Sequence, residues 1–544
     1  MIYMKIKKLI SLLLSVLMIF SVSACSEKKE EKEIRVYTSF FGARGTEISK
    51  NNEIQQLIAE KTGAMCKETW LKEQEDLNTV FADMMVSNKY PDFVVPDGEN
   101  CRKFMNAGVL IPLDNYWNEY PNIKNFYSDT EWNRIRANDG HIYYIPLFSS
   151  CYDHDTSTSH NDEAFWIQVR VLEWAGYPEL KTLDDYFNLI EDYIEANPTD
   201  TDGTEFIGYE ILANDSYFFS LDNPPMFLDG YPNDGACIVD PETLEAKDYN
   251  LTPTAEKWFR KLNDEYKKGI IDPECFVLTS DQYYEKLAKG NVLSMVDQNW
   301  NFNMAVVDLP PECTYIPFSI TADKSIEGQY HSITALNDST GLGITTSCDD
   351  IEGALQFLND LLSPEILTLR FWGIKDVDYS VDENGMFYHT EKQAQQWRDA
   401  DYAKKHICLY NYFPYYFGMS YDGINAYCPS SQPNEFYKNR SDDVKRCFDA
   451  YGVQTFVELL NEASENPPWY PMWSYVPDEN SESGKVSKEI DQLKHHYLPR
   501  IVMADDFDTL WDEYCEAYGQ INTQAYFDDL TQEVRRRKSL SENN

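Results

Sequence analysis

The chain has little positive charge. Its 544 residues contain 47 lysines and arginines against 91 aspartates and glutamates, which gives a formal net charge of −44 and a pI near 4.4. A surface this acidic repels phosphate backbones and anionic lipid head groups, so we expect no nucleic-acid binding and no polybasic membrane docking. It also disfavours strongly anionic ligands unless a local basic pocket overrides the global field. The cations of RRRK (535–538) are expected only to complement the negative end of a final helix dipole.

Long apolar runs are also missing after residue 25, where none reaches the 18 residues of a membrane span. Residues 1–24 have the pattern of a signal peptide, since a lysine-rich start precedes a short apolar stretch over 9–20. The sequence VSAC (22–25) resembles a bacterial lipobox, which predicts cleavage before Cys25 and lipidation of that cysteine. A plain transmembrane anchor is the alternative, but residues 25–33 read as a charged tether. We therefore expect an exported protein that is attached to the membrane through a lipid anchor only.

Signatures of several enzyme and metal-binding classes are absent. The sequence has no G-x-S-x-G, H-E-x-x-H, Walker or G-x-G-x-x-G motif. None of its twelve cysteines forms a C-x-x-C pair, so zinc ribbons and thioredoxin chemistry are unsupported. We expect most cysteines to be small buried side chains, although an oxidising exterior permits some disulfides.

Aromatic side chains, in contrast, are abundant, with 38 Tyr, 28 Phe and 12 Trp. The first of them belong to a β-branched and aromatic segment over 33–41, which predicts a buried strand. A helical pattern then ends at Gly63, and a second strand is expected over 64–72, so these elements predict a βαβ unit and a parallel sheet. A further strand is expected at Phe93 to Val95. Loops after such strands are where ligands bind in open α/β sheets, which singles out 38–45 and 96–99.

The pattern becomes mainly helical after residue 164. Thr182 and Asp185 have the spacing of a capping box before an amphipathic helix that ends before Pro198. Strands return over 313–347, and another amphipathic helix is expected over 351–362. An α/β region that is interrupted and then resumed indicates two lobes between which the chain crosses more than once.

Ten stretches in a characteristic order cover nearly the whole chain and carry a resemblance to a known family. The mature chain resembles the extracellular solute-binding lipoproteins of bacterial ABC transporters, of the carbohydrate type related to maltose-binding protein. The stretches are EKTG (60–63), YPDFVV (90–95), AGVLIPLDNY (107–116), DGHIYYIP (139–146), WAGYPELKTLDDYF (174–187), KKGIIDPE (267–274), KGNVLSMVDQNW (289–300), GLGITTS (341–347), WGIKDVDYSVDENGMFY (372–388) and LWDEYCEAYG (510–519).

The resemblance implies an α/β, two-lobed type II periplasmic-binding fold with several hinge crossings and a ligand cleft between the lobes. The expected N-lobe comprises 34–150 with 325–375, and the expected C-lobe comprises 151–324 with 376–544. Such a protein captures a sugar or oligosaccharide by hinge closure and delivers it to an ABC permease. We expect a monomer without a required cofactor, on the extracellular face of the cytoplasmic membrane of a Gram-positive-type bacterium.

Sugar recognition needs flat aromatic platforms for the C–H faces of the ring and planar polar groups for its hydroxyls. Trp300 follows a predicted strand and aligns with a sugar-stacking tryptophan of the family, so it is the first candidate, with a core position as its alternative. The full set of candidate ligand-binding residues, chosen by type, loop position or family alignment, is Phe40, Phe41, Arg44, Asp97, Tyr217, Trp300, Asn301, Trp372 and Trp473. The acidic balance favours neutral sugars over uronates, which Arg44 in the cleft would reverse.

Two acidic stretches raise the question of a metal. Residues 153–159 have oxygen-bearing side chains at calcium-loop spacing, but they lack the turn glycine and the closing glutamate. The stretch 197–205 lies where many family members carry a calcium-loop-like run, and its candidate ligands are Asp200, Asp202 and Glu205. A solvated turn is the alternative for this stretch.

Two other functions stay open at this point. An extracellular carbohydrate-active enzyme needs two carboxylates at a defined separation, which a sequence with 91 carboxylates does not show. A peptide-binding or sensory member of the same superfamily is the second alternative. The family resemblance favours a binding protein that is not an enzyme.

Overall fold

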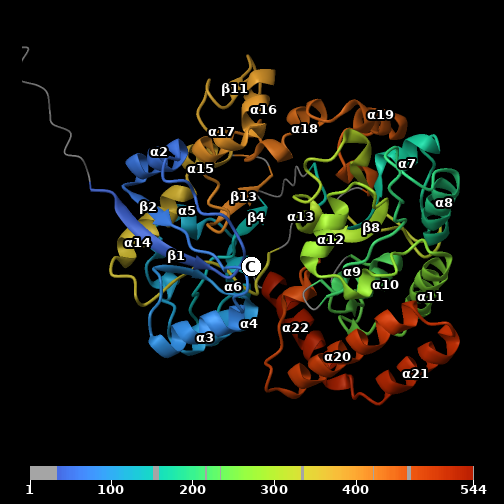
Figure 1. Cartoon of the computed structure of the whole chain (residues 1–544). Coiled ribbons are helices and arrows are strands. Elements are labelled where there is room, and N and C mark those ends of the chain that lie inside the picture. The colour runs from blue at the N-terminus through green and yellow to red at the C-terminus, as the bar shows by residue number, and fades with distance from the viewer. Residues whose placement is uncertain are drawn as a thin grey trace, which may run out of the picture.

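A computed structural model describes residues 33–150, 158–214, 217–232, 235–331, 336–418, 420, 422–461 and 467–542. The predicted signal peptide, Cys25 and the tether up to residue 32 lie outside these residues. Two large hydrophobic cores, built from different parts of the chain, define two α/β lobes (Figure 1). The predicted two-lobed α/β fold is therefore confirmed. None of the described helices combines the length and the apolar character that crossing a membrane requires.

The first lobe is built around a four-stranded sheet with the order β10–β3–β1–β2. Strand β1 (Arg35–Phe41) pairs in parallel with β2 (Ala64–Lys67) and β3 (Phe93–Val95), and β10 (Gly343–Ile344) adds antiparallel to β3. The expected βαβ unit is present, with α2 (Glu53–Thr62) between β1 and β2. Helix α2 ends at Gly63, whose φ of 75° lies in the left-handed region that glycine adopts without a Cβ penalty.

Helices and short strands surround this sheet. They are α3 (Leu77–Ser87), α4 (Gly98–Asn106), α5 (Pro121–Lys124), α6 (Asp129–Arg134), α14 (Ile351–Leu361), α15 (Pro364–Phe371), α16 (Glu391–Arg398), α17 (Ala400–His406), the 3₁₀ turns η1 (Leu113–Asn115) and η2 (Trp117–Glu119), the hairpin β11 (Ser380–Val381) and β12 (Phe387–Tyr388), and the parallel pair β4 (Phe148–Ser150) and β13 (Tyr415–Phe417).

The first lobe extends further along the chain than we expected. Tyr379, Phe413 and Tyr427 are buried in the same core as the N-terminal sheet. The fully buried Arg370 holds this segment in place, since its guanidinium donates hydrogen bonds to five backbone carbonyls, those of Leu361, Leu409, Tyr410, Phe413 and Pro414. Residues 376–428 thus belong to the first lobe rather than to the second.

The second lobe contains a three-stranded antiparallel sheet with the order β8–β5–β9. Its strands are β5 (Glu163–Gln168), β8 (Ser294–Gln298) and β9 (Tyr315–Phe318), with a separate hairpin of β6 (Ile238–Val239) and β7 (Ala246–Lys247). The helices are α7 (Val169–Trp174), α8 (Leu183–Ala196), α9 (Phe219–Asp222), α10 (Pro224–Leu228), α11 (Pro253–Lys268), α12 (Ser280–Leu287), α13 (Asn299–Phe302), α18 (Pro433–Lys438), α19 (Asp442–Tyr451), α20 (Glu482–Val502), α21 (Phe507–Gly519) and α22 (Gln524–Glu542). The 3₁₀ turns are η3 (Cys275–Val277), η4 (Pro311–Cys313), η5 (Pro429–Ser431), η6 (Val457–Leu459) and η7 (Met472–Ser474). The predicted capping box of α8 is present, formed by Thr182 and Asp185.

The chain crosses between the lobes three times. It leaves the first core after Leu147, returns to it between Tyr330 and Leu336, and leaves it again after Cys428. Tyr330 packs in the second core, so the first lobe resumes about ten residues later than the predicted position 325. Several crossings of this kind allow two rigid lobes to move relative to each other.

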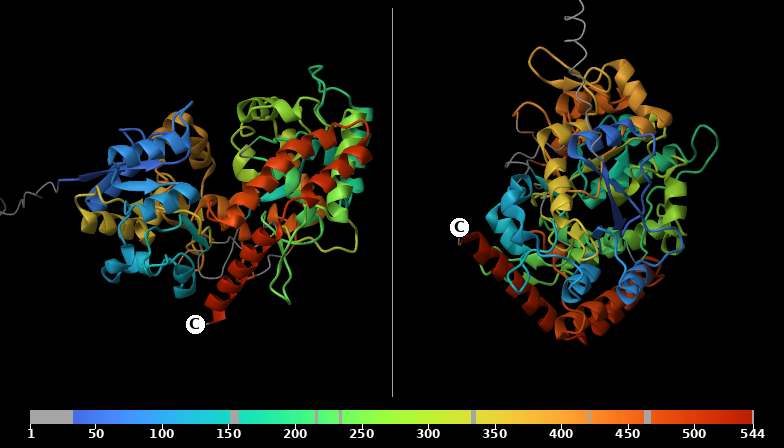
Figure 2. Two further views of the ribbon diagram at one scale, coloured as in Figure 1. Left: turned by 90° about the horizontal axis from the view of Figure 1, so that it is seen from below. Right: turned by 90° about the vertical axis from the view of Figure 1, so that its left-hand side faces the viewer.

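The C-terminal helix α22 connects the two lobes, because it contacts α6 of the first lobe (Figure 1), and Figure 2 shows the C-terminal helices in red from two further sides. The fully buried Arg537 pairs with Asp338 of the first lobe at 3.2 Å and with Glu533 of its own helix at 2.6 Å. Asp338 also pairs with Arg134 of α6 at 3.0 Å. The stretch RRRK therefore supplies a buried ion-pair network between the lobes, which is more than the dipole role that we expected.

Of the ten cysteines that the structure describes, eight are buried. This agrees with the expectation that most cysteines serve as small buried side chains.

Candidate functional site

A cavity of about 1510 Å³ lies between the two lobes. Gly42, Asp97 and Tyr412 line it from the first lobe, whereas Asp162 and Trp300 line it from the second. Because both lobes supply its walls, its shape depends on their relative position.

Both strand-end loops that the sequence analysis singled out contribute to this cavity. Gly42 and Ala43 follow β1, and Pro96 and Asp97 follow β3. Asp97 also caps α4, since its Oδ1 accepts a hydrogen bond of 2.8 Å from the backbone N–H of Asn100. Asp97 therefore both lines the cavity and caps a helix, so its two predicted roles are compatible.

Two large aromatic side chains face the cavity with much of their surface uncovered. Trp300 on α13 is 49% exposed, and Trp473 on η7 is 44% exposed. A hydrogen bond orients the side chain of Trp300, because its indole N–H donates to Oε1 of Gln298. An exposed indole at a cavity wall is a platform against which the apolar face of a ligand can stack.

Three of the nine predicted residues lie in hydrophobic cores and do not line the cavity. Phe40 packs edge-on against Phe81 at 5.5 Å, and Phe41 is fully buried beside Trp70 and Tyr412. Trp372 is also buried, and its indole N–H donates to the carbonyl of Ala426. The prediction is therefore corrected for these three residues. Phe40 and Phe41 lie within β1 and Trp372 directly follows α15, and aromatic side chains at such positions fill the core, whereas the loop after a strand reaches the cleft.

Three further predicted residues lie near the cavity without lining it. Arg44 is exposed, and its neighbour Ala43 lines the cavity instead. Tyr217 packs against the second core, next to the lining residues Phe218 and Phe219. Asn301 is buried, where its amide donates to both carboxylate oxygens of Asp297 at 3.0 Å, so it anchors the helix that carries Trp300.

The cavity wall also contains hydrogen-bond acceptors that sequence reasoning missed. His160 donates from Nε2 to the carbonyl of Glu163 at 2.9 Å, which leaves Nδ1 as an acceptor in the neutral ring. Burial lowers the pKa of His160 to about 4, so the ring is neutral near pH 7. His331 donates from Nδ1 to the carbonyl of Asn461 at 3.1 Å, and its buried Nε2 has no partner among the described residues.

Asp162 is the third such acceptor. It lines the cavity two residues after His160, at the start of β5. Its carboxylate forms no hydrogen bond or ion pair with any described residue, and burial raises its pKa to about 6. The sequence signal for His160 and Asp162 is weak, because only their position just before the buried strand β5 marks them, and His331 has no such signal.

The predicted calcium ligands do not converge. Asp200 accepts a hydrogen bond of 2.9 Å from Arg170 and another from the backbone N–H of Thr201, while Asp202 accepts one from the N–H of Thr204. In the part of the chain that the structure describes, no group of three His, Cys, Asp or Glu residues is arranged to hold a metal ion. The loop 197–205 is thus a tight turn whose first carboxylate is already neutralised by a guanidinium, and it does not fit a calcium site.

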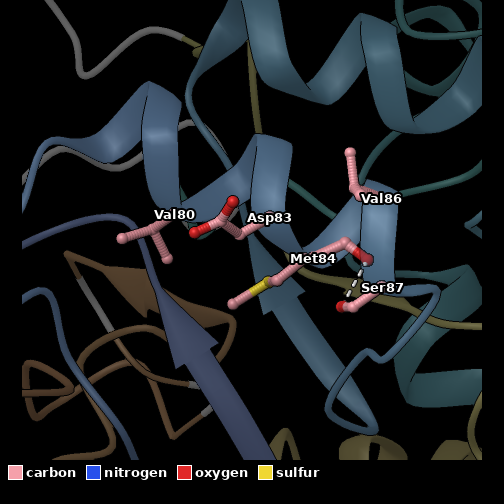
Figure 3. A pocket seen from close by; sticks show the side chains of 5 residues that line it. All are labelled: Val80, Asp83, Met84, Val86 and Ser87. Carbon is pink, nitrogen blue, oxygen red and sulfur yellow. Dashed lines mark hydrogen bonds between the residues drawn. The ribbon is translucent and has the colours of Figure 1, made fainter.

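A smaller depression of about 440 Å³ lies on the surface of α3 (Figure 3). Its lining consists of Val80, Asp83, Met84, Val86 and Ser87, all from that helix, with the hydroxyl of Ser87 turned back to the carbonyl of Met84. Since a single helix provides all of its walls, it cannot enclose a ligand as the interlobe cavity can.

Comparison with known proteins agrees with this architecture. The family described as bacterial extracellular solute-binding protein matches residues 71–377, more than half of the chain. The fructooligosaccharide ABC transporter substrate-binding protein FusA of Streptococcus pneumoniae is 26% identical over 253 residues. That match covers 44% of this chain and only 44% of the relative, which is less than half of its length.

Solved structures match nearly the whole chain at low identity. The structure of FusA in complex with kestose has a TM-score of 0.65 at 16% identity and covers 94% of this chain and 100% of its own. The alginate-binding protein AlgQ2, solved without calcium ion, has a TM-score of 0.61 at 15% identity and covers 93% and 98%. The HMO-binding, ABC-transporter-associated solute-binding protein of Bifidobacterium longum infantis has a TM-score of 0.60 at 13% identity and covers 92% and 98%. The shared fold and the match over 71–377 lead to one conclusion: this chain belongs to the bacterial extracellular solute-binding protein family.

Proposed function

We propose that this protein captures an oligosaccharide in the interlobe cavity and delivers it to the membrane subunits of an ABC importer. The observation that carries the proposal is the pair of half-exposed indoles, Trp300 and Trp473, on the wall of one cavity. Protein packing alone does not explain why these rings are left half exposed, whereas stacking on the apolar faces of sugar rings does. The names of the relatives, which include binders of fructooligosaccharide and alginate, support the same ligand class.

The polar lining fits the hydroxyls of a sugar. Side-chain amides are frequent on the wall, namely those of Asn161, Asn223, Asn250, Asn299, Asn303, Asn337 and Asn411. The amides of Asn161 and Asn411 form no hydrogen bond with described residues, and each offers both a donor and an acceptor to a ligand. A peptide with charged termini has less need of so many neutral amide groups.

The size of the cavity favours an oligomer. Pockets for small ligands typically measure roughly 300–1,000 Å³, and this cavity of about 1510 Å³ is larger. A single sugar ring leaves much of it empty, whereas several linked rings bridge the walls of the two lobes. Ligand contacts with both lobes favour a closed arrangement, because only differential affinity shifts the population toward it.

The cellular setting is part of the proposal. Lipidation at Cys25 is proposed to attach the mature chain to the extracellular face of the cytoplasmic membrane of a Gram-positive-type bacterium, with residues 25–33 as a tether. We propose that the protein acts as a monomer and that its partners are the permease subunits. The lipobox-like sequence VSAC supports the anchor, and globomycin, which inhibits lipoprotein signal peptidase, should cause the uncleaved form to accumulate.

A thermal-shift screen of the mature protein tests the ligand class. Monosaccharides, neutral oligosaccharides and acidic oligosaccharides are compared with di- and tripeptides, since a ligand at a hundredfold excess over Kd stabilises a protein by about 2.7 kcal/mol. We expect oligosaccharides to raise the Tm and peptides to leave it unchanged. Stabilisation by peptides alone would reject the proposal, and so would release of glycan products on incubation, which would identify an enzyme.

A further inference from the structure

The ionised groups that line the cavity are nearly all negative. In the described part of the chain they are the carboxylates of Asp97, Asp162, Asp222 and Asp491 against the ammonium of Lys494, a formal excess of three negative charges. Lys494 is already neutralised, because its Nζ pairs with Oδ2 of Asp222 at 2.5 Å. No arginine lines the cavity among these residues. Arg44, the one cation expected in the cleft, is exposed and outside the lining.

The internal stretches that the structure does not describe contribute no lysine or arginine. They are 151–157, 215–216, 233–234, 332–335, 419, 421 and 462–466. A local basic pocket, which is needed to hold an anionic ligand against the field of this chain, is therefore missing.

Beside the amides of Asn161 and Asn411, which offer both donors and acceptors, two groups that line the cavity offer acceptors only. Nε2 of His331 is buried and has no partner among the described residues, and it carries no proton in the neutral ring because Nδ1 donates to the carbonyl of Asn461. The ionised Asp162 carboxylate has acceptor oxygens only and forms no hydrogen bond or ion pair with described residues. Buried polar groups are normally hydrogen-bonded, so the buried Nε2 of His331 calls for a donor, and the half-buried Asp162 carboxylate offers acceptors to a ligand in the same cavity.

Sugar hydroxyls supply such donors, and a bond from a hydroxyl to a carboxylate is of the stronger, charge-assisted kind. A ligand carboxylate has no proton to donate near pH 7 and faces the same negative charges. Resting on the function proposed above, we propose that Asp162 and His331 form the hydrogen-bond-accepting centre of the ligand site, and that this site takes uncharged oligosaccharides and excludes those bearing carboxylates.

A matched set of ligands tests the charge selectivity. The thermal-shift screen first identifies a neutral oligosaccharide that binds, and its primary alcohols are then oxidised to carboxylates. Calorimetry compares the neutral form, the carboxylated form and the methyl ester of the latter, which restores neutrality on the same carbon framework. We expect the carboxylated form to bind at least tenfold more weakly and the ester to recover part of the loss.

Each outcome of this comparison is decisive. Equal or tighter binding of the carboxylated form overturns the inference but leaves the proposed function standing. A screen in which only uronate oligomers bind has the same two consequences. A screen in which no glycan of either charge binds refutes the proposed function itself.

The isosteric variant Asp162→Asn tests the assigned residue. The substitution removes the negative charge and one acceptor oxygen but keeps the size of the side chain, so we expect the fold to be retained. An unchanged Tm confirms this. We expect at least tenfold weaker binding of the neutral oligosaccharide and a smaller difference between the neutral and carboxylated forms. The matched control is Asp83→Asn on the surface of α3, outside the cavity, which should change neither quantity. Wild-type affinity for both ligand forms in a folded Asp162→Asn protein removes Asp162 from the site.

Discussion

Trp300→Ala is the sharpest test of the proposed platform. A tryptophan buries roughly 150–250 Å² when it is fully covered. Trp300 is 49% exposed in the free protein, so a stacked sugar has about 75–120 Å² left to cover. At about 25 cal/mol per Å² this surface is worth about 2–3 kcal/mol, and a sugar that covers only part of it reduces the value toward 1 kcal/mol.

We therefore expect Trp300→Ala to weaken oligosaccharide binding by about 1–3 kcal/mol, which is roughly 5- to 150-fold in Kd. Isothermal titration calorimetry measures this change directly. The Tm of the free protein should change little, because the half-exposed ring contributes only part of its surface to packing. Trp473→Ala should behave in the same way, since Trp473 is 44% exposed in the same cavity.

Trp174 provides the matched control. It is 46% exposed, similar to Trp300, but it packs edge-on against Tyr193 on the far side of the second core and does not line the cavity. Trp174→Ala should therefore leave the Kd unchanged. Unchanged affinity in folded Trp300→Ala, or an equal loss in Trp174→Ala, would refute the stacking argument.

Two further predictions concern stability. Arg537→Ala leaves the buried Asp338 carboxylate with one guanidinium fewer, so we expect the free energy of unfolding in urea to fall by about 3–5 kcal/mol. The control Arg535→Ala removes an exposed arginine and should have almost no effect. Equal effects of the two substitutions would show that the ion-pair network contributes nothing to stability. Burial and a hydrogen bond shared with Asp272 raise the pKa of Glu210 to about 9. Between pH 4.5 and 9 the folded protein thus holds a proton that the unfolded chain has released, and stability should fall as pH rises, by up to about 1.4 kcal/mol per unit. Glu210→Gln should flatten that slope, and an unchanged slope in the variant would contradict the assignment.

Local pattern was a reliable guide to the elements of the first sheet. Alternation, β-branched residues and glycine breaks predicted β1, α2, β2 and β3 in order, and the parallel registers confirm the βαβ unit. The capping box at Thr182 was equally predictable, because it depends on side chains three residues apart. Such signals are readable from the sequence because the interactions behind them are short-range.

Residue type was a weaker guide to the site. Trp300, Trp473 and Trp372 are all aromatic residues in loops or at element ends, yet two line the cavity and the third is buried against the strand pair β11–β12 and His389. An aromatic ring serves a core and a sugar platform equally well. Only the position of the surrounding elements decides between these roles.

The sequence by itself determined the acidic field, and it correctly predicted the two-lobed α/β class and the two strand-end loops that line the cavity. The tertiary structure alone decided where the first lobe ends, since the buried Arg370 ties residues 409–414 to a core formed by residues far earlier in the chain. It also decided which groups share the cavity: Asp97, Asp162, His331 and Trp473 are separated by up to several hundred residues and meet only because the chain crosses three times between the lobes. No periodicity or short motif records such a meeting, because the contacts that create it are long-range and depend on how two independently packed cores face each other.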